Sequence, residues 1–160
     1  MQDATARGAR YGHTNPIARD WRRLATFYAT VFGCELVPPE RDYGGEVLER
    51  GTAVRAATLR GAHLRLPGYG PDGPTLEIYQ CGVNEPAVGF PAANREGWGH
   101  IAFAVEDVSQ AREAVLAAGG GQHGEIVTPQ TADGRRVTWC YLTDPEGNLV
   151  EGQSWSEPDA

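Results

Sequence analysis

The clearest alternation of bulky and small or polar positions lies at residues 98–107, which read WGHIAFAVED. Successive side chains of a β-strand point to opposite faces, so this pattern predicts a strand with His100, Ala102 and Ala104 on one face and bulky apolar side chains on the other. The bulky face is suited to pack on a helix, while the two alanines leave open space beside the imidazole. The alternation therefore makes His100 a candidate functional residue.

The same pattern occurs near the start of the chain. His13 corresponds to His100, because each follows a glycine and each precedes an aspartate by seven residues, namely Asp20 and Asp107. Apolar residues then recur at helical spacing after each aspartate, which would stand at the N-cap position. The spacing predicts one helix in each half and indicates an internal repeat.

Each predicted helix ends at a glycine, Gly33 or Gly119, where a left-handed residue commonly closes a helix. Further strand patterns follow in both halves and are separated by turn residues. These predicted strands span 53–66, 75–80, 137–142 and 148–153. The sequence thus predicts an α+β fold built from two β-α-β-β-β modules.

Turn-rich composition divides the chain into segments of one structural domain. The stretch between the two halves is rich in proline, glycine and asparagine, which is typical of a linker. The predicted segments are a flexible N-terminus at 1–10, a first module at 11–81, a linker at 82–97, a second module at 98–154 and a tail at 155–160.

Composition narrows the classes of function. The chain has 160 residues and 41% hydrophobic content, enough to bury a core. Its formal charge of −7 repels phosphate backbones and anionic membranes, so we expect neither nucleic acid nor a membrane surface as a partner. The beginning lacks the apolar run of a signal peptide, and no segment has the length of a membrane span, which predicts a soluble cytoplasmic protein.

The three cysteines give no sign of covalent or metal chemistry. Cys34, Cys81 and Cys140 are odd in number and far apart, and no CxxC motif is present. Such spacing suggests neither a disulfide framework nor a thiolate zinc site. We expect ordinary buried thiols.

Four residues occupy equivalent places in the repeat: His13 and His100 on the first strand of each module, and Glu77 and Glu151 on the last. A lone histidine or strand glutamate is usually structural, but four such residues at matched positions rarely arise from packing alone. Two imidazoles and two carboxylates suit a divalent ion such as Zn²⁺, Ni²⁺, Co²⁺, Fe²⁺ or Mn²⁺. The sequence does not choose among these metals.

These motifs resemble the vicinal oxygen chelate superfamily, which includes glyoxalase I, methylmalonyl-CoA epimerase, extradiol dioxygenases and bleomycin and fosfomycin resistance proteins. The likeness rests on Gly12-His13, Leu76-Glu77, the stretch 99–103 and the stretch 144–151. The resemblance implies two paired βαβββ modules that form an incomplete barrel around a metal. All four ligand positions are filled, as in the glyoxalase and epimerase branch, whereas the dioxygenases and fosfomycin enzymes lack a ligand at the place of Glu77.

The resemblance implies a metal-dependent isomerase or lyase that acts on a substrate with two neighbouring oxygens. The ion would stabilise the enediolate formed when an adjacent carbon loses its proton, with Glu77 or Glu151 as the catalytic base. It also implies a homodimer, and the sequence leaves open whether each site forms within one chain or between two.

Two rival functions remain at this stage. The first is a non-catalytic antibiotic-binding resistance protein, for which aromatic side chains would form the walls of the binding site. Those aromatics are Trp98, Trp139, Tyr141 and Tyr79. The second is an Fe²⁺ dioxygenase that uses His13, His100 and Glu151, for which Glu77 would be an awkward fourth ligand.

Other polar residues receive a structural interpretation. His63 and His123 have no equivalent partner in the repeat, so we expect surface or cavity-lining residues rather than ligands. Arg55, Arg60 and Arg65 are suited to grip an anionic substrate, but a solvated sheet edge explains them more simply.

Overall fold

The computed structural model describes residues 8–89 and 91–157, so most of the predicted N-terminal segment and the end of the predicted tail lie outside it. The first module contains β1 (His13–Thr14), α1 (Trp21–Phe32), β2 (Glu35–Gly44), α2 (Glu46–Thr52), β3 (Thr58–Arg65) and β4 (Thr75–Cys81). The second contains β5 (Ile101–Ala104), α3 (Val108–Ala117), β6 (Gly121–Gln122), β7 (Arg136–Thr143) and β8 (Leu149–Ser156).

The two modules have the same sheet topology. The first forms a four-stranded sheet in the order β1-β4-β3-β2, and the second forms one in the order β5-β8-β7-β6. In each, the first strand runs parallel to the last, and the remaining pairs are antiparallel. The predicted α+β fold with an internal repeat is confirmed, and the two sheets remain separate rather than closing into a barrel.

The two long helices begin where the sequence predicts. The Asp20 side chain accepts hydrogen bonds from two backbone amides at the start of α1, and the Asp107 side chain accepts one at the start of α3. Helix α1 ends at Gly33, whose φ of 69° lies in the left-handed region that glycine adopts without strain.

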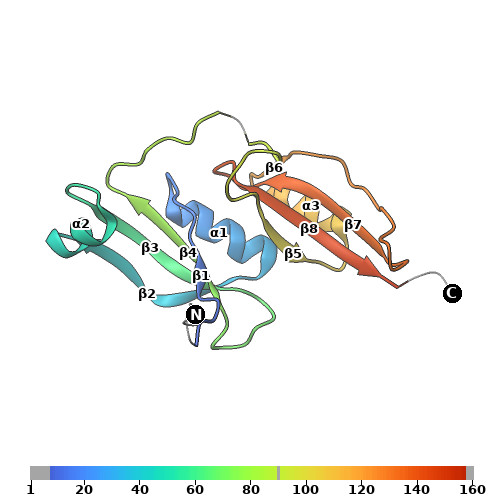
Figure 1. The fold of residues 1–160 in the computed structure, drawn as a ribbon, viewed down its shortest axis with the longest axis horizontal. Coiled ribbons are helices and arrows are strands. Elements are labelled where there is room, and N and C mark those ends of the chain that lie inside the picture. The colour runs from blue at the N-terminus through green and yellow to red at the C-terminus, as the bar shows by residue number, and fades with distance from the viewer. Residues whose placement is uncertain (1–7, 90, 158–160) are drawn as a thin grey trace, which may run out of the picture.

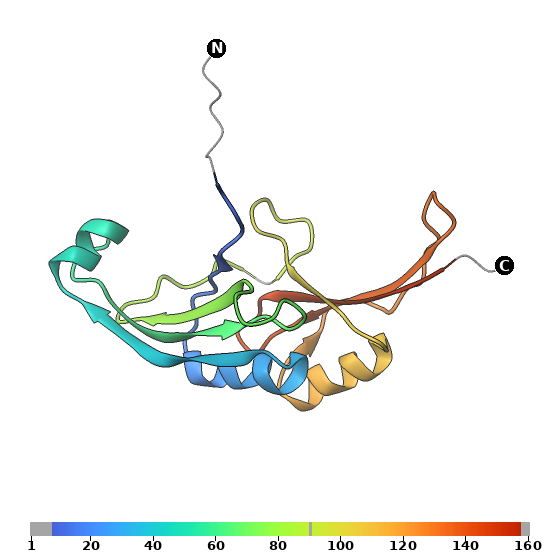
Figure 2. The ribbon, with the colours of Figure 1, turned by 90° about the horizontal axis from the view of Figure 1, so that it is seen from below.

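Helices α1 and α3 both lie on the same side of the two sheets, one under each module, and contact each other (Figure 1, Figure 2). One hydrophobic cluster joins the modules, and the rings of Phe32 and Phe103 stack across the boundary with centroids 4.0 Å apart. We call the sheet surfaces opposite these helices the open faces. Because the helices cover only one side, the open faces are the surfaces on which the polar candidates can meet ligands.

Several boundaries differ from those predicted. Helix α2 was not predicted, and residues 53–57 connect it to β3 through Ala53 and Ala56, both with positive φ, rather than extending the strand. Strand β5 begins only at Ile101. Strand β8 continues through Ser156, into the predicted tail, because it stays paired with the equally long β7.

Two expectations about composition can be compared with the described residues. Within 8–89 and 91–157, no helix is both long enough and apolar enough to cross a membrane. Cys34 and Cys140 are buried as predicted, and burial raises the pKa of Cys34 to about 11. Cys81 is only half-buried.

Candidate functional site

The parallel pairing of β1 with β4 brings His13 to Glu77. His13 lies opposite Thr75 in the register, so its ring reaches the side chain two residues further along β4. Nε2 of His13 lies 3.3 Å from Oε2 of Glu77, and the carboxylate is 16% exposed. Module 1 thus presents an imidazole and a carboxylate together on its open face.

Module 2 repeats this arrangement. Nε2 of His100, the residue before β5, lies 3.1 Å from Oε2 of Glu151, which is 13% exposed. The predicted alternation is confirmed, because Phe103 is buried against the helices while Ala102 and Ala104 are exposed on the open face. Along β5, the positions next to the imidazole therefore carry only methyl groups.

The predicted ligands thus form two His–Glu pairs, one on each module, which we call the half-sites. Two ligands bound about 2.0–2.1 Å from one tetrahedral ion lie about 3.3 Å apart, so each half-site has the separation of two ligands of one metal. Among the described residues, no three or more His, Cys, Asp or Glu side chains are arranged to hold an ion. A single chain therefore fits a divalent metal at each half-site only in part.

His63 is a site residue that the sequence interpretation missed. It lies opposite Glu77 in the pairing of β3 with β4, and its Nε2 is 2.7 Å from Oε1 of that carboxylate. Its Nδ1 is 3.0 Å from Oγ1 of Thr75. The alternation along β3 was the signal that could have found it, because His63 and Arg65 share a face while Ala62 and Leu64 are buried.

Two tyrosines lie beside the half-sites. Burial, and secondarily the Glu77 carboxylate, raises the pKa of Tyr79 to about 12. Its ring fits because the opposite residue is Gly61, where a Cβ would lie 2.4 Å from a ring carbon. In module 2, burial and then the Glu151 carboxylate raise the pKa of Tyr141, whose ring centroid is 5.0 Å from that of His100. Both tyrosines are therefore protonated donors at neutral pH.

The predicted aromatic walls are only partly assembled. Trp139 and Tyr141 pack edge to face on the open face of module 2, with ring centroids 4.9 Å apart. Tyr79 lies in the other module, and Trp98 is 97% exposed. Trp139 and Tyr141 therefore pack together beside one half-site, while Tyr79 lies beside the other.

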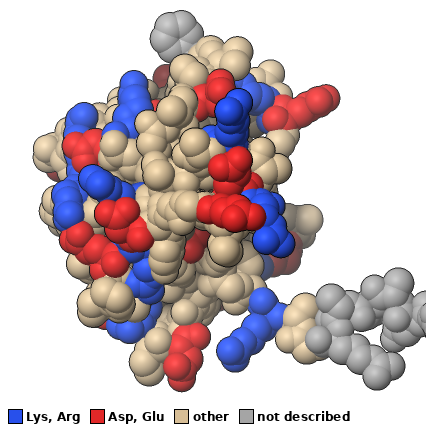
Figure 3. Space-filling view, turned by 90° about the vertical axis from the view of Figure 1, so that its left-hand side faces the viewer, with Lys and Arg blue, Asp and Glu red and all other residues tan. Residues whose placement is uncertain are grey.

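Two of the three candidate arginines of module 1 are engaged with acidic side chains. Arg60 pairs with Asp42, and Arg65 donates to Oε2 of Glu35 at 2.8 Å. Figure 3 shows basic and acidic side chains interspersed on the α2 end of the molecule rather than gathered by sign. This arrangement supports the interpretation of a solvated sheet edge.

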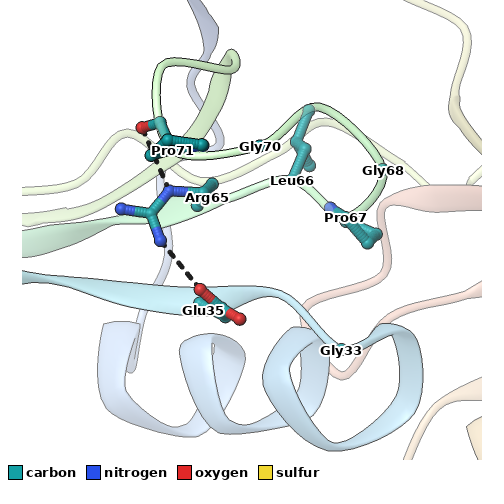
Figure 4. Close-up of a pocket in the computed structure, with 8 residues that line it drawn as sticks. All are labelled: Gly33, Glu35, Arg65, Leu66, Pro67, Gly68, Gly70 and Pro71. Atoms are coloured by element: carbon teal, nitrogen blue, oxygen red, sulfur yellow. Dashed lines mark hydrogen bonds and ion pairs between the residues drawn. The ribbon is translucent and has the colours of Figure 1, made fainter.

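A shallow pocket of about 420 Å³ lies beneath the loop between β3 and β4 (Figure 4). Arg65 crosses it and donates both to Glu35 and to the carbonyl of Pro71. None of the half-site residues lines this pocket or the second described one, which borders α1. The chemistry of the open faces therefore does not coincide with either pocket.

The turn before β8 fastens module 2 to helix α1. Asp144 is buried and accepts hydrogen bonds from the Tyr28 hydroxyl at 2.9 Å and from Asn148. Glu146 accepts from Arg19 at 2.7 Å and from the backbone of Asp20. The predicted turn is thus also a contact between the modules. It fixes the start of β8, the strand that carries Glu151 of the second half-site.

Comparison with known proteins gives one family and several similar structures. The model of the glyoxalase-like domain matches residues 14–151. A glyoxalase family protein from Bacillus cereus is 18% identical, with 96% of this chain and 100% of that chain covered and a TM-score of 0.77. A glyoxalase/bleomycin resistance protein/dioxygenase family enzyme from Burkholderia phytofirmans is 16% identical, with 91% and 98% covered and a TM-score of 0.56.

A third similar structure contains a metal. It is a mutant of the fosfomycin resistance protein FosX from Listeria monocytogenes, in complex with Mn(II) and 1S,2S-dihydroxypropylphosphonic acid. It is 16% identical, with 92% of this chain and 93% of that chain covered and a TM-score of 0.52. No curated protein sequence matched. The resemblance predicted from the sequence motifs is confirmed by the family match and the shared fold.

Proposed function

The chain belongs to the glyoxalase-like domain family, and from that premise we propose that it is a metal-dependent isomerase or lyase that moves a proton beside a carbonyl group. The observation that carries the proposal is the repeated half-site. Each module sets an imidazole 3.1–3.3 Å from a carboxylate on its open face. A divalent ion held by such ligands would polarise the oxygens of a substrate and so acidify a neighbouring C–H. The Mn(II) of FosX supports a divalent ion in this fold.

The proposed roles follow from what surrounds each residue. The two histidines and two glutamates hold the ion, and one glutamate also takes the proton. We assign the proton transfer to Glu151, because Ala102, opposite it in the register, leaves room for a substrate carbon next to that carboxylate. A substrate with two neighbouring oxygens, such as a hydroxyketone, a hemithioacetal or a β-carbonyl thioester, fits this chemistry.

The complete site, in this proposal, forms between two copies of the chain. The half-sites lie on two separate sheets that are joined mainly through α1, α3 and the turn at Asp144. Helices α1 and α3 lie on the other side of the sheets and α2 lies at the far end of module 1, so in this proposal module 2 of a second copy faces module 1 of the first (Figure 2). Each dimer would then contain two sites, each with ligands from both chains.

Metal uptake tests the proposal directly. Protein prepared without chelator and reloaded with Ni²⁺, Zn²⁺, Co²⁺ or Mn²⁺ should bind about one ion per chain, and His13→Ala or His100→Ala should each abolish most of that binding. His123→Ala, which removes an exposed histidine elsewhere on the surface, is the matched control. Failure of every ion to bind the parent protein would overturn the enzyme proposal.

Mixed dimers test whether the site is shared. When His13→Ala and His100→Ala chains are unfolded together and refolded, the mixed dimer keeps one site with all four ligands intact, so metal binding should partly return. A site with all four ligands from one chain would instead lack one histidine in every chain, so metal binding would not return. Absence of any recovery in verified mixed dimers would show that the site lies within single chains.

A second candidate function is a non-catalytic binder of an aromatic or cationic small molecule. The packed pair of Trp139 and Tyr141 on the open face favours it, because such rings provide stacking surfaces. The two functions differ in their requirement for metal. If the protein is a non-catalytic binder, its ligand should quench the tryptophan fluorescence equally well in chelator-treated protein. His13→Ala and His100→Ala should then leave ligand binding unchanged.

A further inference from the structure

We propose that His63 is a positioning residue that holds Glu77 in place as a metal ligand, an inference that rests on the proposed function. Nε2 of His63 lies 2.7 Å from Oε1 of Glu77, while Oε2 of the same carboxylate faces His13 at 3.3 Å. The two imidazoles thus approach different oxygens of one carboxylate. His63 thus holds Oε1 of Glu77, and Oε2 points toward His13.

The hydrogen-bond partners set the direction of this contact. The Glu77 carboxylate has no proton to donate, so Nε2 of His63 carries the ring proton, and Nδ1 then accepts from the Thr75 hydroxyl 3.0 Å away. Nε2 then donates to the Glu77 carboxylate, which only accepts. Thr75, His63 and Glu77 therefore form one ordered chain of hydrogen bonds across β3 and β4.

The surroundings make this contact strong enough to matter. The side chains of His63 and Glu77 are only 22% and 16% exposed, so water competes weakly for the hydrogen bond. A glutamate has three rotatable side-chain bonds, and fixing one oxygen restricts the direction of the other. Partners of metal ligands that act in this way typically contribute about 10–100-fold to metal affinity.

Module 2 lacks an equivalent histidine that holds its glutamate. The register that places His63 opposite Glu77 places Tyr141 opposite Glu151. Tyr141 approaches the ring of His100 rather than making a described hydrogen bond to the glutamate. The structure therefore assigns Glu77 as the anchored ligand, which leaves Glu151 as the carboxylate with freedom to move a proton.

Cobalt binding by the full-length chain tests the assignment. Co²⁺ affinity is measured by competition with a chromophoric chelator, and the visible absorption of bound Co²⁺ reports its ligands. His63→Ala should weaken Co²⁺ binding about 10–100-fold, and Thr75→Val should weaken it less. His63→Gln should recover part of the loss, because its amide can donate to Glu77. His123→Ala, the matched control, should bind like the parent.

Each outcome is decisive. Parent-like affinity in His63→Ala and Thr75→Val would overturn the positioning role while leaving the proposed metal site intact. A Co²⁺ spectrum that changes as much in His63→Gln as in His63→Ala would show that His63 binds the ion itself, which also overturns it. Absence of Co²⁺ binding in the parent would instead overturn the proposed function. If His63→Ala fails to fold, the Gln and Thr75→Val variants carry the test.

Discussion

In module 1 the strand next to β4 presents His63 to Glu77, whereas in module 2 the strand next to β8 presents Tyr141 to Glu151 at the same register. The folds around these positions are alike, with the same strand order and the same aspartate-capped helix. The difference lies in one side chain across the strand pair. It shows how a repeated module can keep its His–Glu pair while giving its two carboxylates unequal surroundings.

The aromatic side chains differ in the same way. In module 1 the ring of Tyr79 on β4 lies over Gly61, and in module 2 Trp139 on β7 lies opposite Gln153. The large ring thus sits on the last strand of one module and on the third strand of the other. The open face of module 1 is accordingly polar around its carboxylate, while that of module 2 combines aromatic rings with the small side chains of β5.

The sharpest test of this asymmetry replaces each glutamate by glutamine. Glutamine keeps an oxygen for coordination but removes the basicity, so Glu151→Gln should lower kcat about 10²- to 10⁴-fold while retaining much of the bound ion. Glu77→Gln should lose more metal affinity, because its amide can donate to the ligands around it. Exchange of solvent ²H into the carbon next to the carbonyl of a bound substrate analogue measures the proton transfer.

Equal behaviour of the two glutamine variants would contradict the proposed difference between Glu77 and Glu151. Equal loss of exchange in Glu77→Gln and Glu151→Gln, at equal metal content, would mean that the two carboxylates share the proton transfer. Parent-like exchange in both variants would mean that neither is the base and that the proposed mechanism is wrong.

A smaller effect is expected where the modules join. Tyr28→Phe removes the hydroxyl that donates to buried Asp144 and should lower the free energy of unfolding by about 1–3 kcal/mol in urea titrations. Burial, and then the Asp144 charge, raises the pKa of Tyr28 well above 10. Its proton therefore stabilises the fold below pH 10, and each pH unit above that removes about 1.4 kcal/mol from the parent until the folded pKa is reached.

The comparison between parent and variant isolates this residue, since other tyrosines titrate in both proteins. Tyr28→Phe should lose stability less steeply than the parent above pH 10. Identical slopes would show that Tyr28 does not carry the alkaline dependence. Tyr141→Phe, which removes a hydroxyl from the open face, is the control for the loss of the inter-module bond.

The smallest predicted difference concerns the helix caps. Asp20 accepts from the amides of Arg22 and Arg23, while Asp107 accepts only from that of Gln110 among the described contacts. Asp20→Ala and Asp107→Ala should each cost about 0.5–2 kcal/mol, with the larger loss for Asp20. Thermal unfolding of the two variants measures this order, and the reverse order would mean that the second hydrogen bond adds nothing.

Features set by nearby residues were predicted well from the sequence. The aspartate caps, the glycine end of α1 and the faces of the strand after His100 depend on residues within a few positions, and all are confirmed. The repeat also located both half-site pairs, because parallel pairing of first and last strands follows from the module topology.

Features set by distant pairing were not predicted. The role of His63 depends on the register between β3 and β4, which the loop between them decides and which composition does not reveal. Helix α2 is short, with no buried residue to give it a periodic apolar pattern. The separation of the half-sites depends on the packing of α1 against α3, a contact between halves that repeat spacing alone does not specify.

Strand β1, only two residues long, makes the half-site of module 1 one of the last parts of the fold to form. It joins β4 across a loop of the whole module, and Asn15 reaches the carbonyl of Glu77, 62 positions away in the chain. Such distant contacts form late, after the hairpins that build the rest of the sheet. An ion bound by His13 and Glu77 would therefore select molecules whose sheet is complete. At a concentration 100 times its Kd, the ion would make detachment of this edge strand about 2.7 kcal/mol less favourable, so the fraction of chains with a complete sheet would depend on the metal concentration.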